Sequence, residues 1–564
     1  MLDDDKILEL DYSSTSKSRK FLIGFTTYIL LIVFFNLLSS YKNPTIRIEN
    51  KLISIHTYEF QRILKKQVES LNNQLFNDSV QDLNLVIKEL LVKFYEERNY
   101  NAVWIDNFNT NERFSVLLNL LDSSAYFGFP FDYFNVSRIH ELTSEFFVPS
   151  QGYNHQEQKI ELELTATFSA LKFILYLKHG IIEKDTSKVY LTSIETLPEI
   201  LNQAINQKHF RDDILAAQPN LVNHRNLLKS LSYFIDLHYS VKYTTPAFID
   251  DKLLAKSLYY AEMTKSPVFD STNPKMQALN NLAEQFNLPK DSILNIPSHV
   301  ALVSLLEYKY ILACLNINRL RKLKHSGENY LFVNIPEFKL HVVESNEEKE
   351  TFNVIVGKKI TPTPVFSSSI EQVVANPYWT VPKSIVNNEM IYKIRKDSTY
   401  LRRNGFFIIN GREETVDESV INWNSEDPLG NKYYIRQINS KNNALGQIKF
   451  IFPNDYSVYL HDTPSKNLFS RENRTFSHGC IRLENPNKLA QYLTDIYHPL
   501  DKYDIDKMIT ENEHQVIDLA EKINIHIQYI TCAGINNEDM MFYKDIYNLD
   551  KEEIKAIFPN LPGI

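Results

Sequence analysis

The residues best suited to chemistry in this 564-residue chain lie in two short stretches, YLHD at 459–462 and SHGCIR at 477–482. A cysteine thiol attacks only as the thiolate, and its ordinary pKa near 8.5 leaves it mostly protonated at neutral pH. A histidine near its ordinary pKa of about 6.5 can accept that proton. Two histidines precede Cys480, His478 by two residues and His461 by 19 (480 − 461). Together they predict a cysteine nucleophile with a histidine base.

Each neighbour of Cys480 has a geometric reason to contribute. His461 ends an alternating apolar stretch, which predicts a strand that brings it opposite Cys480 from an adjacent segment. Residues i and i+2 of a strand share one face, so His478 is expected beside the thiol. Gly479 allows the backbone to approach a ligand closely. Its N–H and that of Cys480 are candidate donors to a developing oxyanion.

Several alternatives remain open from the residues alone. A lone cysteine is often an inert buried side chain, which is the interpretation preferred for Cys314 and Cys532. A zinc site built from His461, His478 and Cys480 would lack the usual ligand spacing and a clear fourth ligand. Either histidine could be merely structural. Arg482 either forms a surface salt bridge or binds a substrate carboxylate.

The surrounding sequence predicts the elements that position these groups. Short strands bounded by Pro and Gly are expected at 330–334, 338–343, 352–357, 372–374, 405–409, 448–452 and 457–461. Apolar residues at helical spacing predict helices at 82–92, 114–121, 160–179, 223–243, 276–286 and 304–323. The expected fold class is α+β, a helical N-terminal scaffold domain followed by a mainly β catalytic domain. A helical and loop insertion at 383–443 interrupts the second domain.

Composition and charge place the chain in a cellular context. With 43% hydrophobic and 23% charged residues, wholesale disorder and coiled-coil rods are excluded. A net charge of −8 without a basic run speaks against a nucleic-acid partner. Residues 21–38 carry no charge and suit a membrane span, and flanking basic residues favour a cytoplasmic N-terminus. We prefer an uncleaved anchor to a cleaved signal peptide, and no other segment reads as a span.

The pattern H-x15-S-H-G-C-I-R at 461–482 resembles the signature of the YkuD-type L,D-transpeptidases. Four further stretches resemble the large, membrane-anchored, YcbB-like subfamily, namely VGK at 356–358, TPTPVF at 361–366, NPYWTVP at 376–382 and LGQIKF at 445–450. FYEERNY at 94–100, with Trp104, resembles the scaffold domain of that subfamily. The resemblance covers about residues 85–550.

The resemblance implies a role for each matching residue. Cys480 would be the nucleophile and His461 the proton acceptor and donor, oriented by the backbone carbonyl of Asp462. His478 and Gly479, with Cys480, would form the oxyanion region. Residues that would line the substrate site are Tyr459, Arg482, Trp379 and Asp462. The 383–443 insertion would cap the cleft, and no metal or organic cofactor is implied.

The same resemblance implies the domain order. It comprises a cytoplasmic tail (1–20), a transmembrane anchor (21–40), a helical scaffold domain (50–250), a helical segment like a peptidoglycan-binding module that lacks its glycines (251–325), the catalytic domain (329–515), and a C-terminal extension (516–564) packed on the scaffold and catalytic domains. The enzyme would sit in the bacterial inner membrane by a single pass, with its catalytic domain in the periplasm.

The implied activity is 3→3 cross-linking of peptidoglycan stem peptides through a Cys thioester. An L,D-carboxypeptidase or a protein-to-wall transferase using the same thiol is an alternative, as is a non-catalytic wall-binding scaffold. Expected partners are stem peptides, the inner membrane and other cell-wall synthesis proteins, without nucleic acid.

Overall fold

The structure is a computed structural model. It describes residues 46–75, 83–106, 109–129, 133–145, 154–181, 194–265, 267–269, 272–323, 327–497, 502–535 and 538–559. The expected tail (1–20) and anchor (21–40) lie outside these residues. The chain divides into two units, residues 1–67 and 68–564. The described part of the first unit is residues 46–67 of helix α2 (Ile46–Leu75).

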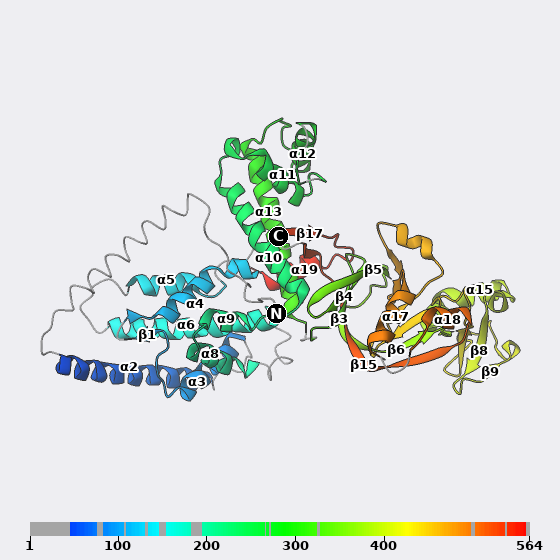
Figure 1. Ribbon diagram of the computed structural model, residues 1–564, viewed down its shortest axis with the longest axis horizontal. Helices are drawn as coiled ribbons and strands as arrows, with labels where there is room; N and C mark the ends of the chain where they lie inside the picture. The colour runs from blue at the N-terminus through cyan, green and yellow to red at the C-terminus, as the bar shows by residue number, and fades with distance from the viewer. Residues whose placement is uncertain are drawn as a thin grey trace. The chain divides into compact units, whose positions relative to one another are not determined.

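A group of helices forms the first part of the second unit (Figure 1). It comprises α3 (Leu83–Glu97), α4 (Glu112–Asp122), α5 (Val136–Glu145), α6 (Asn154–His179), α8 (Leu197–Asn206), α9 (Phe210–Leu215) and α10 (Val222–Tyr243). The helices predicted at 82–92, 114–121, 160–179 and 223–243 are thereby confirmed to within a few residues. Asn111 caps α4, because its side chain accepts a hydrogen bond from the backbone N–H of Phe114 at 3.0 Å.

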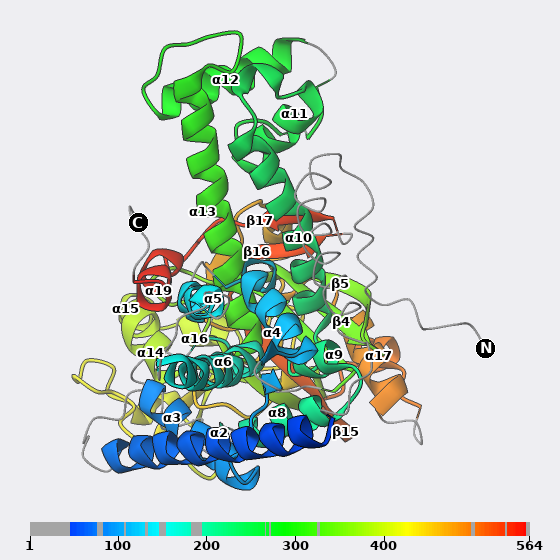
Figure 2. The same cartoon turned by 90° about the vertical axis from the view of Figure 1, so that its left-hand side faces the viewer.

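Helices α11 (Asp251–Tyr260), α12 (Thr272–Gln285) and α13 (Ile296–Arg321) follow. Figure 2 shows α13 beside α10, with α11 and α12 at one end of the pair. In the described part of the chain, α13 has the length and apolar composition of a membrane span, contrary to the sequence analysis. Its buried Arg321 donates to the carbonyl of Phe127 at 2.7 Å and lies over the ring of Phe129. These contacts are those of a core helix.

Most of residues 330–528 belong to a region built on a nine-stranded sheet with the order β13-β5-β14-β12-β11-β6-β15-β3-β4. Its strands are β3 (Tyr330–Asn334), β4 (Lys339–Glu344), β5 (Glu347–Gly357), β6 (Phe366–Ala375), β11 (Ile448–Ile451), β12 (Leu460–His461), β13 (Thr475–Ser477), β14 (Ile481–Leu483) and β15 (Gln515–Gln528). Strand β4 also pairs with β5, which closes the sheet on itself. Apolar side chains from most of these strands form one buried core.

Two sequence expectations for this sheet need correction. The strand predicted at 457–461 contains only Leu460 and His461, because Asn454 accepts hydrogen bonds from the N–H groups of Tyr456 and Val458 and keeps that segment in a turn. The sheet also continues beyond residue 515, the expected end of the domain. Strand β15 lies between β6 and β3 and is a central strand of the sheet.

Residues 379–437 form a smaller sheet with its own core. The order is β7-β10-β8-β9, with β7 (Trp379–Thr380), β8 (Phe406–Asn410), β9 (Thr415–Val416) and β10 (Tyr433–Gln437). The helical part comprises α14 (Lys383–Ile385), the π-helical turn η4 (Val386–Met390), α15 (Ile391–Lys396) and α16 (Tyr400–Arg403). Its core, which includes Val386, Ile394, Ile408 and Ile435, is separate from that of the main sheet. Most of the predicted 383–443 insertion is therefore an independently packed subdomain.

The chain after β15 returns to the helices. Strands β16 (Cys532–Ile535) and β17 (Asp539–Phe542) form a hairpin in contact with α10, and α19 (Asp550–Ile557) contacts α13. The backbone N–H of Thr531 donates to Asn316 Oδ1 at 2.8 Å, and Arg319 Nε donates to Glu553 Oε2 at 2.9 Å. These buried polar contacts tie the end of the chain to α13.

Candidate active site

Three neighbouring strands place charged and titratable side chains on one face of the main sheet. His461 on β12 is the register partner of Lys449 on β11 and of Arg482 on β14. Residues paired across neighbouring strands point to the same face, so these three side chains share one face. Leu460 and Ile481 alternate with them, point to the other face and are fully buried in the core. Burial of these apolar side chains in the core therefore directs the three polar side chains to the opposite face of the sheet.

Cys480 directly precedes β14, and Tyr459 directly precedes β12. The N–H of Ile481 donates to the carbonyl of Tyr459 at 3.2 Å, which joins the starts of the two strands. The thiol lies 4.0 Å from the carbonyl oxygen of Ser457. The Tyr459 phenol also lies close enough to the thiol and to the Trp379 side chain on β7 to interact with both. Trp379, Tyr459 and Cys480 therefore form a connected series.

The thiol of Cys480 is predominantly neutral in this environment. Burial raises its pKa, while the N–H and phenol of Tyr459 and the charges of Lys449 and Arg482 favour the thiolate. The net shift is upward, so the thiolate fraction at neutral pH is below that of a free cysteine. Burial also raises the pKa of Tyr459, which keeps its hydroxyl protonated and able to donate.

His461 is a buried, neutral imidazole. Its Nδ1 lies 2.5 Å from the carbonyl oxygen of Asp462. A carbonyl can only accept, so Nδ1 carries the hydrogen and Nε2 keeps its lone pair. Burial, together with the charges of Arg482 and Lys449, lowers the pKa of His461 to about 3, although the carbonyls of Asp462 and Leu445 act in the opposite direction. Among the described residues no hydrogen bond joins this ring to the Cys480 thiol, although Cys480 directly precedes β14, the strand paired with β12.

Arg482 has unused hydrogen-bonding capacity. Its Nε is buried and has no hydrogen-bond partner among the residues that the structure describes. Burial lowers its pKa, and the neighbouring Cys480 acts in the opposite direction. A half-buried guanidinium beside the thiol is suited to an anionic group on a ligand.

The carboxylate of Asp462 is engaged within the protein. Its Oδ2 accepts from the N–H of Gln447 at 2.9 Å, and its Oδ1 lies 2.6 Å from Lys466 Nζ. Gly446 packs against it with a positive φ of 61°, and an added Cβ would lie 2.2 Å from Oδ2. These contacts indicate a structural role for the side chain. The contribution of Asp462 to the site is its carbonyl, which holds His461.

The continuous strand from which the sequence analysis placed His478 beside the thiol is not formed. Strand β13 ends at Ser477, and Gly479 adopts a φ of +118°, so the alternation of a continuous strand is broken between His478 and Cys480. His478 Nε2 instead lies 2.6 Å from Glu389 Oε1 in the π-helical turn η4. The loop before the thiol is thereby joined to the smaller subdomain.

Comparisons with known proteins agree with this geometry. The family model described as "L,D-transpeptidase catalytic domain" (YkuD) matches residues 328–505, and the model described as "Scaffold domain" matches residues 89–231. The chain carries a YkuD-type L,D-transpeptidase catalytic domain. It also carries the scaffold domain, so it has the YcbB-type architecture.

A Haemophilus influenzae protein named "Putative L,D-transpeptidase" is 30% identical over 293 residues. That match covers 50% of this chain and 56% of the relative, so the chain spans about half the length of the curated relative. A solved L,D-transpeptidase from Mycobacterium smegmatis is 15% identical and is covered to 59%, against 36% of this chain, with a TM-score of 0.17. A TM-score this low supports no conclusion.

The loop that carries Cys480 in the L,D-transpeptidase domain is held by residues to which the sequence analysis gave no role. Ser477 Oγ donates to the carbonyl of Cys480 at 2.6 Å and accepts from the N–H of Gly479 at 3.1 Å. Thr363 Oγ1 donates to the carbonyl of Gly479 at 2.8 Å, and its N–H donates to the hydroxyl of Tyr547 at 3.2 Å. The Gly479 N–H, predicted to face an oxyanion, is therefore already occupied.

Lys449 is the other functional candidate that sequence reasoning missed. It lies in the quoted LGQIKF stretch, and its Nζ lies 4.0 Å from the centroid of the Tyr459 ring. Burial lowers its pKa. A lysine within an alternating apolar strand was the available signal, because its side chain must point away from the core.

The zinc alternative gains no support from this geometry. No group of three or more His, Cys, Asp or Glu side chains within the described ranges could share a metal ion. His478 Nε2 is engaged with Glu389.

Proposed function

We propose that the protein is an L,D-transpeptidase that cross-links peptidoglycan stem peptides 3→3 through a thioester on Cys480. The observation that carries this proposal is the common face of β11, β12 and β14, where His461 lies between Lys449 and Arg482 and Cys480 directly precedes β14. The matched catalytic-domain family supports the same chemistry.

Acylation begins from a neutral pair. The Cys480 sulfur attacks the carbonyl carbon of the third stem residue while its proton passes to Nε2 of His461, which the Asp462 carbonyl keeps as the acceptor. Rotation of the thiol from the Ser457 carbonyl toward the ring precedes this transfer. Collapse of the tetrahedral intermediate breaks the amide C–N bond. The imidazolium returns the proton to the leaving D-amino acid, and a thioester remains.

The second half-reaction regenerates the thiol. The side-chain amine of another stem peptide attacks the thioester carbonyl, the C–S bond breaks, and His461 passes the proton from the amine to sulfur. The new amide joins the two third residues. Water as the acceptor would give carboxypeptidation instead.

The oxyanion is assigned to the backbone around the nucleophile. The N–H of Cys480 has no hydrogen-bond partner in the described part of the chain, whereas that of Gly479 donates to Ser477. A well-aligned donor of this kind is worth roughly 3–4 kcal/mol of transition-state stabilisation. His478 is assigned a positioning role in the same loop through its contact with Glu389.

Substrate binding is assigned to Arg482, Trp379 and Tyr459. The buried Nε of Arg482, which has no partner in the described part of the chain, is available for a stem carboxylate, and Trp379 lies next to Tyr459, which neighbours the thiol. The 379–437 subdomain supplies Trp379 and Glu389, which supports its proposed function as a cap over the cleft. Residues 21–40 would anchor the enzyme in the inner membrane and leave this site in the periplasm.

The test is covalent labelling of Cys480. Purified protein incubated with a tetrapeptide stem or a carbapenem should gain one acyl mass on the peptide that contains Cys480, and Cys480→Ala should gain none. Cys314→Ala and Cys532→Ala are matched controls, because both thiols are fully buried and burial raises the pKa of each, that of Cys314 to about 12. Acylation that persists in Cys480→Ala would refute the assignment. Product masses distinguish a cross-linked dimer from a hydrolysed tripeptide.

A further inference from the structure

Residues 94–104 of the scaffold domain, which contain the FYEERNY stretch and Trp104, include buried side chains that have no role in the catalytic chemistry. The carboxylate of Glu163 on α6 is fully buried and accepts hydrogen bonds from the N–H groups of Val103 and Trp104 and from the Tyr95 hydroxyl. Thr167 accepts from the indole N–H of Trp104 at 2.8 Å. This network fixes the segment that follows α3 against α6.

The residues that directly follow α3 form a turn over the end of that helix. Asn99 and Tyr100 adopt left-handed φ angles of 50° and 58°. The N–H of Asn99 donates to the carbonyl of Glu96 at 3.0 Å, and that of Tyr100 to the carbonyl of Tyr95 at 2.8 Å. The turn is thus held from both sides, by its own hydrogen bonds and by the buried Glu163 network. It presents polar side chains at a defined position.

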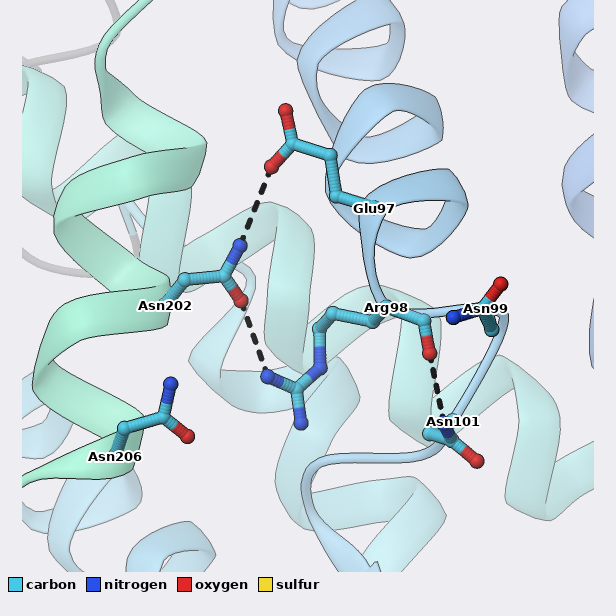
Figure 3. A pocket seen from close by; sticks show the side chains of 6 residues that line it. All are labelled: Glu97, Arg98, Asn99, Asn101, Asn202 and Asn206. Atoms are coloured by element: carbon cyan, nitrogen blue, oxygen red, sulfur yellow. Dashed lines mark hydrogen bonds between the residues drawn. The ribbon is translucent and has the colours of Figure 1, made fainter.

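These side chains line a pocket of about 480 Å³ together with the last turns of α8 (Figure 3). Its lining residues are all polar, namely Glu97, Arg98, Asn99, Asn101, Asn202 and Asn206. Asn202 lies at the centre, since its Oδ1 accepts from Arg98 Nη1 at 3.1 Å and its Nδ2 lies 3.4 Å from Glu97 Oε2. The volume is in the usual range for small-ligand sites, about 300–1,000 Å³.

The pocket retains free hydrogen-bonding groups. Arg98 Nε is buried without a partner among the described residues, while its guanidinium lies 5.5 Å from the Phe94 ring centroid. The exposed amide of Asn206, four residues after Asn202 on the same face of α8, makes no hydrogen bond within the described ranges. The amide of Asn101 uses its nitrogen on the Arg98 carbonyl and leaves its oxygen as an acceptor.

The combination of groups selects the ligand class. No apolar side chain lines the pocket, so an oily ligand would gain little from binding there. The carboxylate of Glu97 offsets the guanidinium of Arg98, which disfavours a polyanion such as a phosphate chain. Carboxamides donate and accept at once, which matches the hydroxyl and acetamido groups of an amino sugar. The exposed rim at Glu97, Asn101 and Asn206 leaves room for a polymer to continue past the pocket.

We infer that this scaffold pocket binds the glycan strand of the cell-wall polymer, separately from the stem peptide at Cys480. The sugar class follows from the pocket, whereas its identity as the peptidoglycan strand rests on the proposed function. The pocket would retain the enzyme on its polymeric substrate between successive acylations.

The experiment measures binding of the full chain to peptide-free glycan strands, prepared from peptidoglycan with an amidase. Wild type should bind, and the double variant Asn202→Ala/Asn206→Ala should bind at least about tenfold more weakly, since two or more hydrogen bonds are lost. Gln203→Ala is the matched control, because it removes an exposed amide from another face of the same helix. Acylation of Cys480 by a soluble tetrapeptide should be equal in all three proteins.

The outcomes separate this inference from the proposed function. Failure of wild type to bind the strands, unchanged binding in the double variant, or an equal loss in Gln203→Ala would each overturn the glycan site. If Cys480 is not acylated while strand binding depends on Asn202 and Asn206, the glycan site stands and the transpeptidase assignment fails.

Discussion

Two histidines in the main sheet are equally hidden from solvent and yet differ in charge. His341 on β4 and His461 on β12 are 7% and 5% exposed. Burial lowers the pKa of each ring. At His341 the carboxylates of Glu337 and Glu348, at 3.0 and 2.7 Å, outweigh burial and raise the pKa to about 9. At His461 the neighbouring charges are cationic, and the pKa falls to about 3.

The difference shows that the neighbours, more than the burial, determine what a buried histidine can do. At neutral pH His341 is an imidazolium whose two N–H groups are both committed to carboxylates, so it has no lone pair for catalysis. His461 is neutral, has one N–H committed to a carbonyl and keeps the other nitrogen as an acceptor. The same residue type is a structural ion pair on β4 and a candidate general base on β12.

The largest expected effect comes from removing each ring in turn. His461→Gln should slow acylation of Cys480 by roughly 10²–10⁴-fold, the usual contribution of a general acid–base group. His341→Gln should leave the rate nearly unchanged, because that ring has no free nitrogen. Single-turnover acylation by a tetrapeptide, with circular dichroism to confirm folding, provides the measurement. Comparable losses in two folded variants would break the comparison.

The cationic surroundings of His461 can be tested through the thiol. Lys449→Met removes a charge that favours the Cys480 thiolate, so the already raised thiol pKa should rise further. Below the pKa the thiolate fraction falls about tenfold per pH unit, so a higher thiol pKa should move the iodoacetamide alkylation curve to higher pH. The rate at pH 7 should fall roughly three- to tenfold for a shift of about half to one unit.

Lys522→Met, which removes a surface ion pair with Glu371, should leave the alkylation curve in place. A wild-type curve with a rapid plateau below pH 5 would indicate a preformed thiolate–imidazolium pair. That result would contradict the neutral resting state.

Much of the fold was accessible from sequence because its signals are local. The helices at 83–97, 112–122 and 222–243 and the hairpin at 330–344 follow from apolar spacing and turn residues. Strand β15 was missed as part of the catalytic sheet. Its long-range pairing with β3 and β6 brings together segments about 150 to 200 residues apart, and no local pattern encodes such a pairing.

The candidate site divides in the same way. Cys480, His461 and Arg482 could be predicted because residue type and motif spacing carry their chemistry, and the register of β12 with β14 brings them to one face. The strand alternation used to place His478 does not hold, because Gly479 adopts a left-handed φ and β13 ends at Ser477. Lys449 is a candidate because its strand pairs with the strand of His461, and the local sequence does not encode that pairing.

His341 and His461 should also affect the pH dependence of folding stability in opposite ways. The pKa of His341 in the folded protein, about 9, exceeds its unfolded value near 6.5. Its ion pairs therefore stabilise fully below pH ~6.5, and that stabilisation is lost as pH rises through 9. We expect roughly 1–3 kcal/mol of wild-type stability to disappear between pH 6.5 and 10, and His341→Gln to lack this loss.

His461→Gln serves as the control for this pH window. The folded-state pKa of His461 is depressed to about 3, so its contribution changes only between pH 3 and 6.5 and is constant above. Thermal unfolding from pH 6.5 to 10 should therefore have the wild-type slope in His461→Gln. A slope that vanished in this variant, and not in His341→Gln, would reverse the assignment.

The smallest expected effect concerns His478, a histidine with a carboxylate partner at a partly exposed position. The side chains of His478 and Glu389 are 39% and 42% exposed. Ion pairs between exposed side chains contribute about 0–1 kcal/mol of stability. Glu389→Gln should therefore slow acylation by at most about fivefold, through a less ordered loop before Gly479. The wild-type rate should approach that of the variant as NaCl rises to about 1 M, where the charges are screened.

Glu426→Gln, which removes an exposed carboxylate from the same subdomain, should change neither the rate nor its salt dependence. A loss of a hundredfold or more in Glu389→Gln would place His478 in the chemistry itself, and the division between a base at His461 and a positioning residue at His478 would then fail.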